Sequence, residues 1–295
     1  MDVTVVIRAA GERTEELCRY IIERQVPKEQ VFLIHERPFW KAVKRTFEIG
    51  VEEGRKWTLA VDADVLVSSD GIERLITLAS KVKKPLFCYQ GYVMDFVFGR
   101  ARDGGPHLYN TSYLKNALGF VKSDVSVLRP ESDTYRALAE QGIYTVVDSH
   151  LFGLHDYYQF HHDYFRKGYF HSIKSSSDKE NFGFLTYWAN NMTTFPELEC
   201  LLRGWLLGKK SSEYRVDIDF FKSLNLEESI DPLKEISSDL FLEYMNQADE
   251  LSSNISISKL RYKELPKRKL SFLMRVKSWV GWRLISLGTF MKARN

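Results

Sequence analysis

The sequence predicts an α/β protein built around a mostly parallel sheet that is flanked by helices. Short apolar runs rich in β-branched residues alternate with amphipathic stretches, and the segments between them are short. This alternation continues from the first residues to about residue 92. With 44% hydrophobic and 14% aromatic residues, a chain of 295 residues can bury a sizeable core, which excludes a wholly disordered protein.

The first third of the chain supplies the most regular elements. Strands are expected where β-branched and aromatic residues gather, at residues 3–7, 30–35, 57–61 and 85–92. Helices are expected where apolar residues recur at helical spacing, from Thr14 to the residue before Pro27, at 38–54 and at 71–82. Because helices separate the strands, most of the strands are expected to run in the same direction.

Beyond Asp95 the pattern is less regular. The segment 102–107, Arg-Asp-Gly-Gly-Pro-His, is expected to be a loop from its composition. The other expected elements are a strand at 143–147 and helices at 111–121, at 132–141 and from Asp156 to residue 170. The expected parts of the chain are an α/β domain at 1–175, a mainly helical extension at 176–260 and a basic amphipathic tail at 261–295, with a linker at 175–178.

Two carboxylates, Asp62 and Asp64, directly follow the apolar strand at 57–61. In α/β proteins ligands bind beyond the carboxyl ends of the strands. Carboxylate oxygens are preferred ligands of Mg²⁺ and Mn²⁺, and these ions commonly join one or two carboxylates to substrate phosphates. A plain turn after a strand also favours aspartate, but the flanking pattern favours a metal–diphosphate site at Asp62 and Asp64.

The cysteines and the N-terminal residues limit the class of protein. Cys18, Cys88 and Cys200 are odd in number and widely spaced, which argues against a disulfide scaffold and a zinc ribbon. No apolar stretch approaches the ~20 residues that span a bilayer, and the first residues lack the basic segment of a signal peptide. We therefore expect a cytoplasmic protein.

The charge is unevenly distributed along the chain. Residues 261–295 contain ten Lys or Arg against one acid, which leaves 32 basic against 38 acidic side chains in residues 1–260. Trp279 and Trp282 lie beside aliphatic residues in this tail, a composition suited to an anionic lipid surface. We expect residues 265–295 to bind the inner face of the membrane peripherally; the alternative is a helix docked on the domain. Nucleic-acid binding is not expected, because the body is acidic and no such module is recognisable.

The order of these features resembles a GT-A glycosyltransferase, the α/β fold that transfers a sugar from a nucleotide diphosphate donor. The resemblance extends over residues 1–170. It rests on the first strand with its loop at 8–13, a second strand ending near His35, the Asp62-Ala63-Asp64 motif, and a later histidine, His155, in Gly153-Leu154-His155-Asp156.

This resemblance implies a metal-dependent glycosyltransferase with Mn²⁺ or Mg²⁺ as cofactor and a nucleotide diphosphate sugar as donor. The acceptor it implies is a glycan or a lipid-linked molecule, used in surface polysaccharide or glycolipid synthesis. The metal ligands it implies are Asp62, Asp64 and His155. The nucleotide-sugar contacts it implies are Arg8, Ala9, Arg13, His35 and Asp62.

Further roles follow from the chemistry of transfer. An inverting enzyme needs a carboxylate that takes the proton of the acceptor hydroxyl. Asp148, which follows the strand at 143–147, and Asp95 are the candidates, and the sequence does not decide between them. Gly105 and His107, in the segment expected to be a loop, are candidates for acceptor binding; the alternative is a plain turn between elements.

Two other functions stay open at this point. A sugar-phosphate nucleotidyltransferase usually opens with a Gly-rich loop followed by a lysine, whereas Arg8-Ala9-Ala10-Gly11 is poor in glycine. A non-catalytic, membrane-docked binding protein of the transferase fold would lack metal and nucleotide binding. Dedicated zinc is not expected, because the histidines at 150–171 match no familiar zinc signature.

Overall fold

The computed structural model describes residues 1–123, 130–174, 178–211, 218–224, 226, 246, 250 and 261–263. All of these residues belong to one compact unit, Met1–Glu264. Three residues of the expected linker, 175–177, and the tail at 265–295 lie outside the described residues. The expected division of the chain at residues 175 and 260 therefore stays a prediction.

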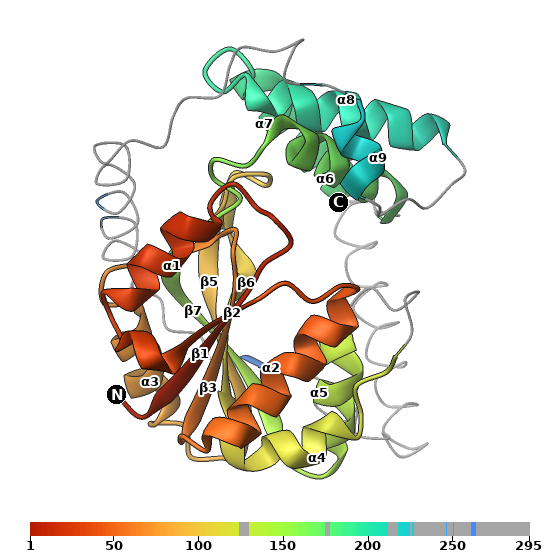
Figure 1. Ribbon diagram of the computed structural model, residues 1–295. Coiled ribbons are helices and arrows are strands. Elements are labelled where there is room, and N and C mark those ends of the chain that lie inside the picture. Colours follow the sequence, from red (N-terminus) through yellow and green to blue (C-terminus); the bar gives the residue numbers. More distant parts are fainter. Residues whose placement is uncertain are drawn as a thin grey trace, which may run out of the picture. The chain divides into compact units, whose positions relative to one another are not determined.

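One sheet forms the centre of this unit (Figure 1). Its strands are β1 (Val3–Arg8), β2 (Val31–Ile34), β3 (Trp57–Asp62), β4 (Val65–Val67), β5 (Leu86–Asp95), β6 (Arg100–Asn110), β7 (Tyr144–His155) and β8 (Arg261–Lys263). They lie in the order β2-β1-β3-β6-β5-β7-β4, and β8 pairs with β7. β1, β2, β3, β5 and β7 run in one direction, and β4, β6 and β8 run in the other. The mostly parallel α/β sheet is therefore confirmed.

The sheet curls back on itself at the carboxyl end of β3. β3 and β4 are four places apart in the strand order, yet only residues 63 and 64 connect them. β4 pairs with β7 so that Val65 lies opposite His155. Gly153 permits this close pairing, because a Cβ atom there would lie 2.1 Å from the Leu66 carbonyl oxygen. The curl therefore brings the end of β7 beside the turn that contains Asp64.

Helices cover both faces of the sheet (Figure 1). They are α1 (Glu15–Glu23), α2 (Phe39–Glu53), α3 (Gly71–Ala79), α4 (Leu114–Leu118) and α5 (Pro130–Glu140), with the short 3₁₀ helices η1 (Lys28–Gln30) and η2 (Thr111–Tyr113). α1 and α3 pack on one face against alternate residues of the central strands, such as Val5 and Leu59. α2, α4 and α5 pack on the other face, around Phe47, Phe87 and Tyr109. Each face thus buries its own apolar core, which accounts for the expected alternation of strands and helices.

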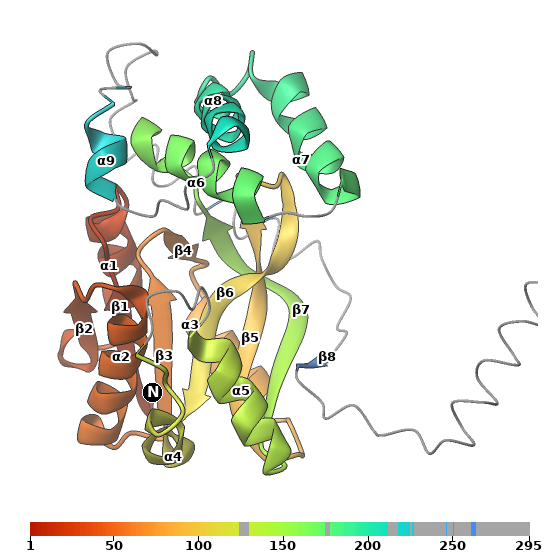
Figure 2. The ribbon, with the colours of Figure 1, turned by 90° about the vertical axis from the view of Figure 1, so that its right-hand side faces the viewer.

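The remaining helices form a third apolar cluster beyond the end of β5 (Figure 2). They are α6 (His161–Lys174), α7 (Asp178–Asn191), α8 (Glu197–Lys210) and α9 (Ile218–Lys222). The Trp188 indole is fully buried in this cluster, and its Nε1 donates a hydrogen bond to the Val97 carbonyl oxygen at 2.7 Å. This bond joins α7 to the segment that directly follows β5. The helical cluster is therefore in direct contact with the end of the sheet.

The prediction of a loop at 102–107 is wrong, because these residues belong to β6. Gln90 of β5 pairs with His107, and Tyr92 pairs with Asp103, so β6 carries extra residues between the two pairs. The Gly-Gly-Pro triplet at 104–106 fills this bulge, where a proline removes no ladder hydrogen bond. Gly105 leaves room for the neighbouring strand, since a Cβ atom there would lie 3.0 Å from the Gly91 carbonyl oxygen.

The helix expected from Asp156 begins only at His161, so that prediction is also wrong at its start. β7 is longer than expected and continues to His155. Between β7 and α6, Asp156 and Tyr158 have φ values of 64° and 61°. This left-handed conformation cannot be part of an α-helix and is uncommon for a bulky residue such as tyrosine. The chain therefore turns sharply after His155 before α6 begins.

Candidate active site

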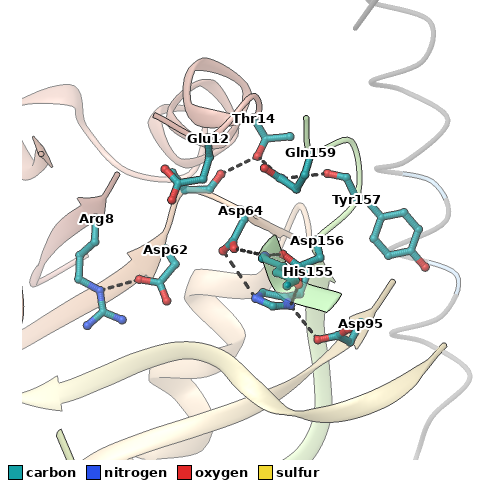
Figure 3. A network of polar contacts seen from close by, with 12 residues as sticks. Arg8, Glu12, Thr14, Asp62, Asp64, Asp95, His155, Asp156, Tyr157 and Gln159 are labelled. Carbon is teal, nitrogen blue, oxygen red and sulfur yellow. Dashed lines mark hydrogen bonds and ion pairs between the residues drawn. The ribbon is translucent and has the colours of Figure 1, made fainter. Parts of the chain in front are cut away.

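The carboxyl ends of three strands meet at one edge of the sheet (Figure 3). β1 and β3 are parallel neighbours, and their register places Arg8 opposite Asp62. β7 reaches the same place through the curl, and the Asp156 backbone N–H donates a hydrogen bond to the Asp64 carbonyl oxygen at 3.0 Å. The sequence-predicted residues Asp64 and His155 are thus brought together, although His155 follows Asp64 by 91 positions. Asp62, the third predicted metal ligand, pairs with Arg8 instead.

Asp64, His155 and Asp156 form a group of possible metal ligands. One side-chain ligand atom from each lies within 4.8 Å of the others. Asp64 Oδ1 is buried and has no hydrogen-bond partner among the described residues, and it lies 3.6 Å from His155 Nε2. A buried carboxylate oxygen without a donor is costly unless a cation or a donor reaches it. The oxygen and imidazole ligands present here fit Mn²⁺ or Mg²⁺.

Asp95 orients the histidine of this group. Its carboxylate is fully buried and lies 2.8 Å from His155 Nδ1, so Nε2 faces Asp64 (Figure 3). Asp95 also pairs with Arg102 and accepts a hydrogen bond from the Phe98 backbone N–H at 3.0 Å. Burial alone would raise the pKa of Asp95, but His155 and Arg102 outweigh it and hold that pKa well below its usual range. Asp95 is therefore an ionised partner of His155, and a carboxylate on one nitrogen of a histidine is typical of the surroundings of metal-ligand histidines.

Arg8 is held by two carboxylates on the other side of the site. Its guanidinium is 5% exposed and lies 2.7 Å from Asp62 Oδ1 and 2.6 Å from Glu131 Oε1. Glu131, from α5, also lies 3.2 Å from His107 Nδ1. Burial would raise the pKa of Glu131, but Arg8 and His107 hold it well below its usual range. The expected nucleotide ligand Arg8 and the expected acceptor ligand His107 thus belong to one buried network, whose central acid, Glu131, was not predicted.

The loop at 8–13 lies over the carboxylates of the site. Ala9 N–H donates to the Ile34 carbonyl oxygen at 2.9 Å, which places the loop beside the end of β2. His35 is exposed there, with its Nε2 2.9 Å from Glu15 Oε1. The nucleotide contacts expected of Ala9, Arg13 and His35 stay predictions.

Glu12, a residue of this loop that was not predicted, is the third carboxylate near Asp62 and Asp64 (Figure 3). Its Oε2 accepts a hydrogen bond from the Ala10 backbone N–H at 2.6 Å. Burial and the charge of Asp64 raise the pKa of Glu12 to about 7. The crowding of three acids at one edge of the sheet favours a bound cation.

Glu12→Gln is expected to stabilise the protein at pH 8 and to leave its stability nearly unchanged at pH 4, below both pKa values of Glu12. The native pKa of Glu12 is about 7 and its ordinary value is 4.5, so the native state binds this proton more tightly than the unfolded chain. The stability of the wild type therefore falls as the pH rises between these two values, and glutamine removes that loss.

The expected gain in Tm at pH 8 is roughly a few degrees, measured by thermal denaturation without added metal. Glu29→Gln, at an exposed glutamate of η1, is the control. An equal Tm difference at both pH values would contradict this role of Glu12.

The two acids expected to act as a base have other partners. Asp148 is buried in β7, where it accepts hydrogen bonds from the Tyr89 hydroxyl and, at 3.1 Å, from the His150 backbone N–H. Asp95 is bound to His155 and Arg102, as described above. In contrast, Asp163 Oδ2, at the start of α6, is buried and receives no hydrogen bond within the part of the chain that the structure describes. Burial raises the pKa of Asp163; the nearby Arg166 and His162 oppose this effect without cancelling it, and the charge of Asp64 adds to it.

Comparisons with known proteins give distant structural similarities. No family model matches the chain, and none of the curated proteins matches it either. The mannosyltransferase PcManGT from Pyrobaculum calidifontis, in complex with GDP-Man and Mn²⁺, is 10% identical over 87% of this chain and 88% of that chain, with a TM-score of 0.39. A cytidylyltransferase from Leptospira borgpetersenii serovar Hardjo-bovis is 11% identical over 73% of this chain and 100% of that chain, with a TM-score of 0.39.

A third solved structure is the bifunctional IspDF from Campylobacter jejuni. It is 14% identical over 50% of this chain, with a TM-score of 0.35, and the matched part spans 50% of that chain. At these TM-scores the similarities carry no weight for function, which has to follow from the geometry of the site itself.

Proposed function

We propose that this protein is a metal-dependent glycosyltransferase that moves a sugar from a nucleotide diphosphate sugar to a glycan or a lipid-linked acceptor. The observation that carries the proposal is the buried Asp64 oxygen without a hydrogen-bond donor among the described residues, 3.6 Å from His155 Nε2. It lies where a mostly parallel sheet ends, which is where α/β proteins bind nucleotides. A second feature in support is the crowding of Glu12, Asp62 and Asp64.

The residues of the site divide into those that hold the cation and those that position them. Asp64, His155 and Asp156 would hold Mn²⁺ or Mg²⁺, and Asp95 would keep the His155 ring in place. When bound, such an ion stabilises the negative charge that develops on the leaving diphosphate. Arg8 fixes the Asp62 carboxylate, so that Asp62 keeps one position at the edge of the site. Arg13, at the end of the loop, is a cationic donor suited to the donor phosphates.

Proton transfer from the acceptor is assigned to Asp163 in preference to Asp148 and Asp95. Asp163 Oδ2 accepts no hydrogen bond within the described part of the chain, and the ion pairs of Asp163 with His162 and Arg166 are long, at 3.6 and 3.5 Å. Asp148 and Asp95, in contrast, form short hydrogen bonds with neighbouring side chains. The raised pKa of Asp163 makes it a stronger base than an ordinary aspartate.

Thermal denaturation with a panel of nucleotide sugars, with and without Mn²⁺, tests the proposed function. A bound ligand raises Tm by mass action, so we expect one nucleotide sugar to raise it only when Mn²⁺ is present. Release of the nucleoside diphosphate from that donor would then show transfer or donor hydrolysis. A larger shift with a nucleoside triphosphate and a sugar phosphate would instead indicate the nucleotidyltransferase. If none of these ligands changed Tm, the remaining interpretation would be a non-catalytic binding protein.

Membrane association is a separate part of the proposal. None of the helices in the described residues is long and apolar enough to cross a bilayer. The tail at 265–295, which was expected to bind anionic lipid, lies outside the described residues. Peripheral binding at the inner face of the membrane therefore rests on the basic and aromatic composition of that tail.

A further inference from the structure

A lysine lies among the acids of the candidate metal site. Lys167, from α6, places its Nζ 2.9 Å from Asp64 Oδ2 and in direct contact with Asp156 Oδ1. Its side chain is 16% exposed, so water screens this contact only partly. Asp64 and Asp156 are two of the possible metal ligands, so the ammonium group contacts two carboxylates that a divalent cation would also bind.

The backbone of Lys167 is held firmly in place. The next residue, Gly168, packs so closely on α8 that a Cβ atom there would lie 2.0 Å from the Leu201 carbonyl oxygen. Gly204 of α8 makes the reciprocal contact, since a Cβ atom there would lie 2.0 Å from the Phe165 carbonyl oxygen. Because α6 and α8 touch backbone to backbone, a displacement of α6 would disrupt this packing. A change in the position of the ammonium is therefore assigned to the flexible lysine side chain.

The charges around Asp64 explain why an internal cation is needed. Glu12, Asp156 and Asp163 all lie near Asp64, and Asp156 and Asp163 are buried. Unpaired buried carboxylates repel one another and are costly to desolvate. Burial would raise the pKa of Asp64, but Lys167 and His155 outweigh it and keep Asp64 ionised. The lysine thus supplies a positive charge in direct contact with two of these carboxylates, Asp64 and Asp156.

We propose that Lys167 is an internal counter-cation that competes with the divalent metal ion for Asp64 and Asp156. Without the ion, the ammonium neutralises these carboxylates and holds them in position. When the ion binds, the ammonium leaves them, so part of the binding free energy of the metal is spent on breaking the lysine contacts. The inference rests on the proposed function, because it takes the metal site at Asp64 as given.

Titration of purified protein with Mn²⁺ alone, followed by calorimetry, tests this competition. Lys167→Met keeps the apolar length of the side chain and removes the charge, and we expect it to bind Mn²⁺ roughly tenfold more tightly than the wild type, or more. Arg166→Met is the matched control. It removes a neighbouring positive charge of α6 whose ion pair, at 3.5 Å, is with Asp163. We expect its Mn²⁺ affinity to stay within about threefold of the wild type.

Thermal denaturation of the same proteins separates competition from a structural role. Lys167→Met should have a lower Tm than the wild type without metal and should regain that loss in saturating Mn²⁺. A lysine with a purely structural role would lower Tm equally in both conditions. Equal or weaker Mn²⁺ affinity in Lys167→Met would overturn the competition while leaving the metal site intact. If neither protein bound Mn²⁺, the proposed metal site and the inference would both be wrong.

A measurement on the wild type avoids dependence on the folding of the variant. Acetic anhydride modifies accessible lysine amines, and mass spectrometry gives the extent at each position. Lys167 should be modified slowly without metal and several-fold faster with Mn²⁺, while exposed lysines such as Lys28 should not change. Modification of Lys167 that is independent of Mn²⁺ would overturn the inference.

Discussion

Asp64→Ala is expected to abolish Mn²⁺ binding and to lower turnover of the nucleotide sugar by a factor on the order of 10³ or more. Asp64 has a buried oxygen that accepts no hydrogen bond in the described part of the chain and lies 3.6 Å from His155 Nε2, so this oxygen is available to a cation. The lost contacts are with Lys167 and His155, and neither lies in an apolar core. The fold should therefore persist, with a Tm within a few degrees of the wild type.

The control for Asp64→Ala is the same substitution at a carboxylate that lies at the surface, away from the candidate metal site. Asp70 precedes α3, its side chain is 61% exposed, and its ion pair with Arg74 is long, at 3.7 Å. Asp70→Ala should keep Mn²⁺ affinity and turnover within about twofold, because a surface ion pair contributes little. If Asp64→Ala kept wild-type turnover in the presence of Mn²⁺, Asp64 would not be a metal ligand of the reaction.

Arg8→Met is expected to lower the free energy of unfolding by roughly 3–5 kcal/mol, the cost of leaving a buried charge without its partner. The guanidinium lies between Asp62 and Glu131, and the Glu131 side chain is only 10% exposed. Methionine can fill the space of the arginine stem but leaves the Glu131 carboxylate with His107 as its nearest cationic partner. Urea denaturation with linear extrapolation measures the loss.

An exposed arginine of the same chain provides the control for this prediction. Arg19 pairs with Glu23 at 2.7 Å, one helical turn away on α1, and its side chain is 47% exposed. Arg19→Met should cost less than about 1 kcal/mol. The double variant Arg8→Met with Glu131→Gln should recover part of the loss, because it removes the charge that Arg8→Met leaves unpaired. Equal losses in Arg8→Met and Arg19→Met would contradict the buried network.

The sequence was sufficient to predict elements whose own residues determine them. β1 and β3 are apolar runs rich in β-branched residues, and their parallel pairing follows from the helices α1 and α2 that lie between them in the chain. The turn that contains Asp64 could also be located, because it directly follows the predicted strand β3. β6 was missed because its bulge contains two glycines and a proline, and a bulge depends on the register of the neighbouring strand, here β5.

The partners of the site residues could not be predicted from local pattern. Glu131 pairs with Arg8 across 123 positions, and Lys167 pairs with Asp64 across 103 positions. No periodicity or spacing indicates which acid meets which base at such separations, since the curl of the sheet and the packing of α6 on α8 decide it. His155 was found because it follows a glycine in an expected strand-to-helix turn, whereas Asp163 and Glu12 carried no comparable signal.

The central claim is that Asp64 and His155 hold a divalent cation at the carboxyl end of β3. X-ray diffraction at the manganese absorption edge tests it most directly, on wild-type crystals soaked with Mn²⁺ and the nucleoside diphosphate of the donor that gives the largest thermal shift. We predict an anomalous peak bonded to an Asp64 carboxylate oxygen and to His155 Nε2, with the Lys167 ammonium moved away from Asp64. A peak bonded to other residues, or crystals that contain the nucleotide without manganese at Asp64, would contradict the claim.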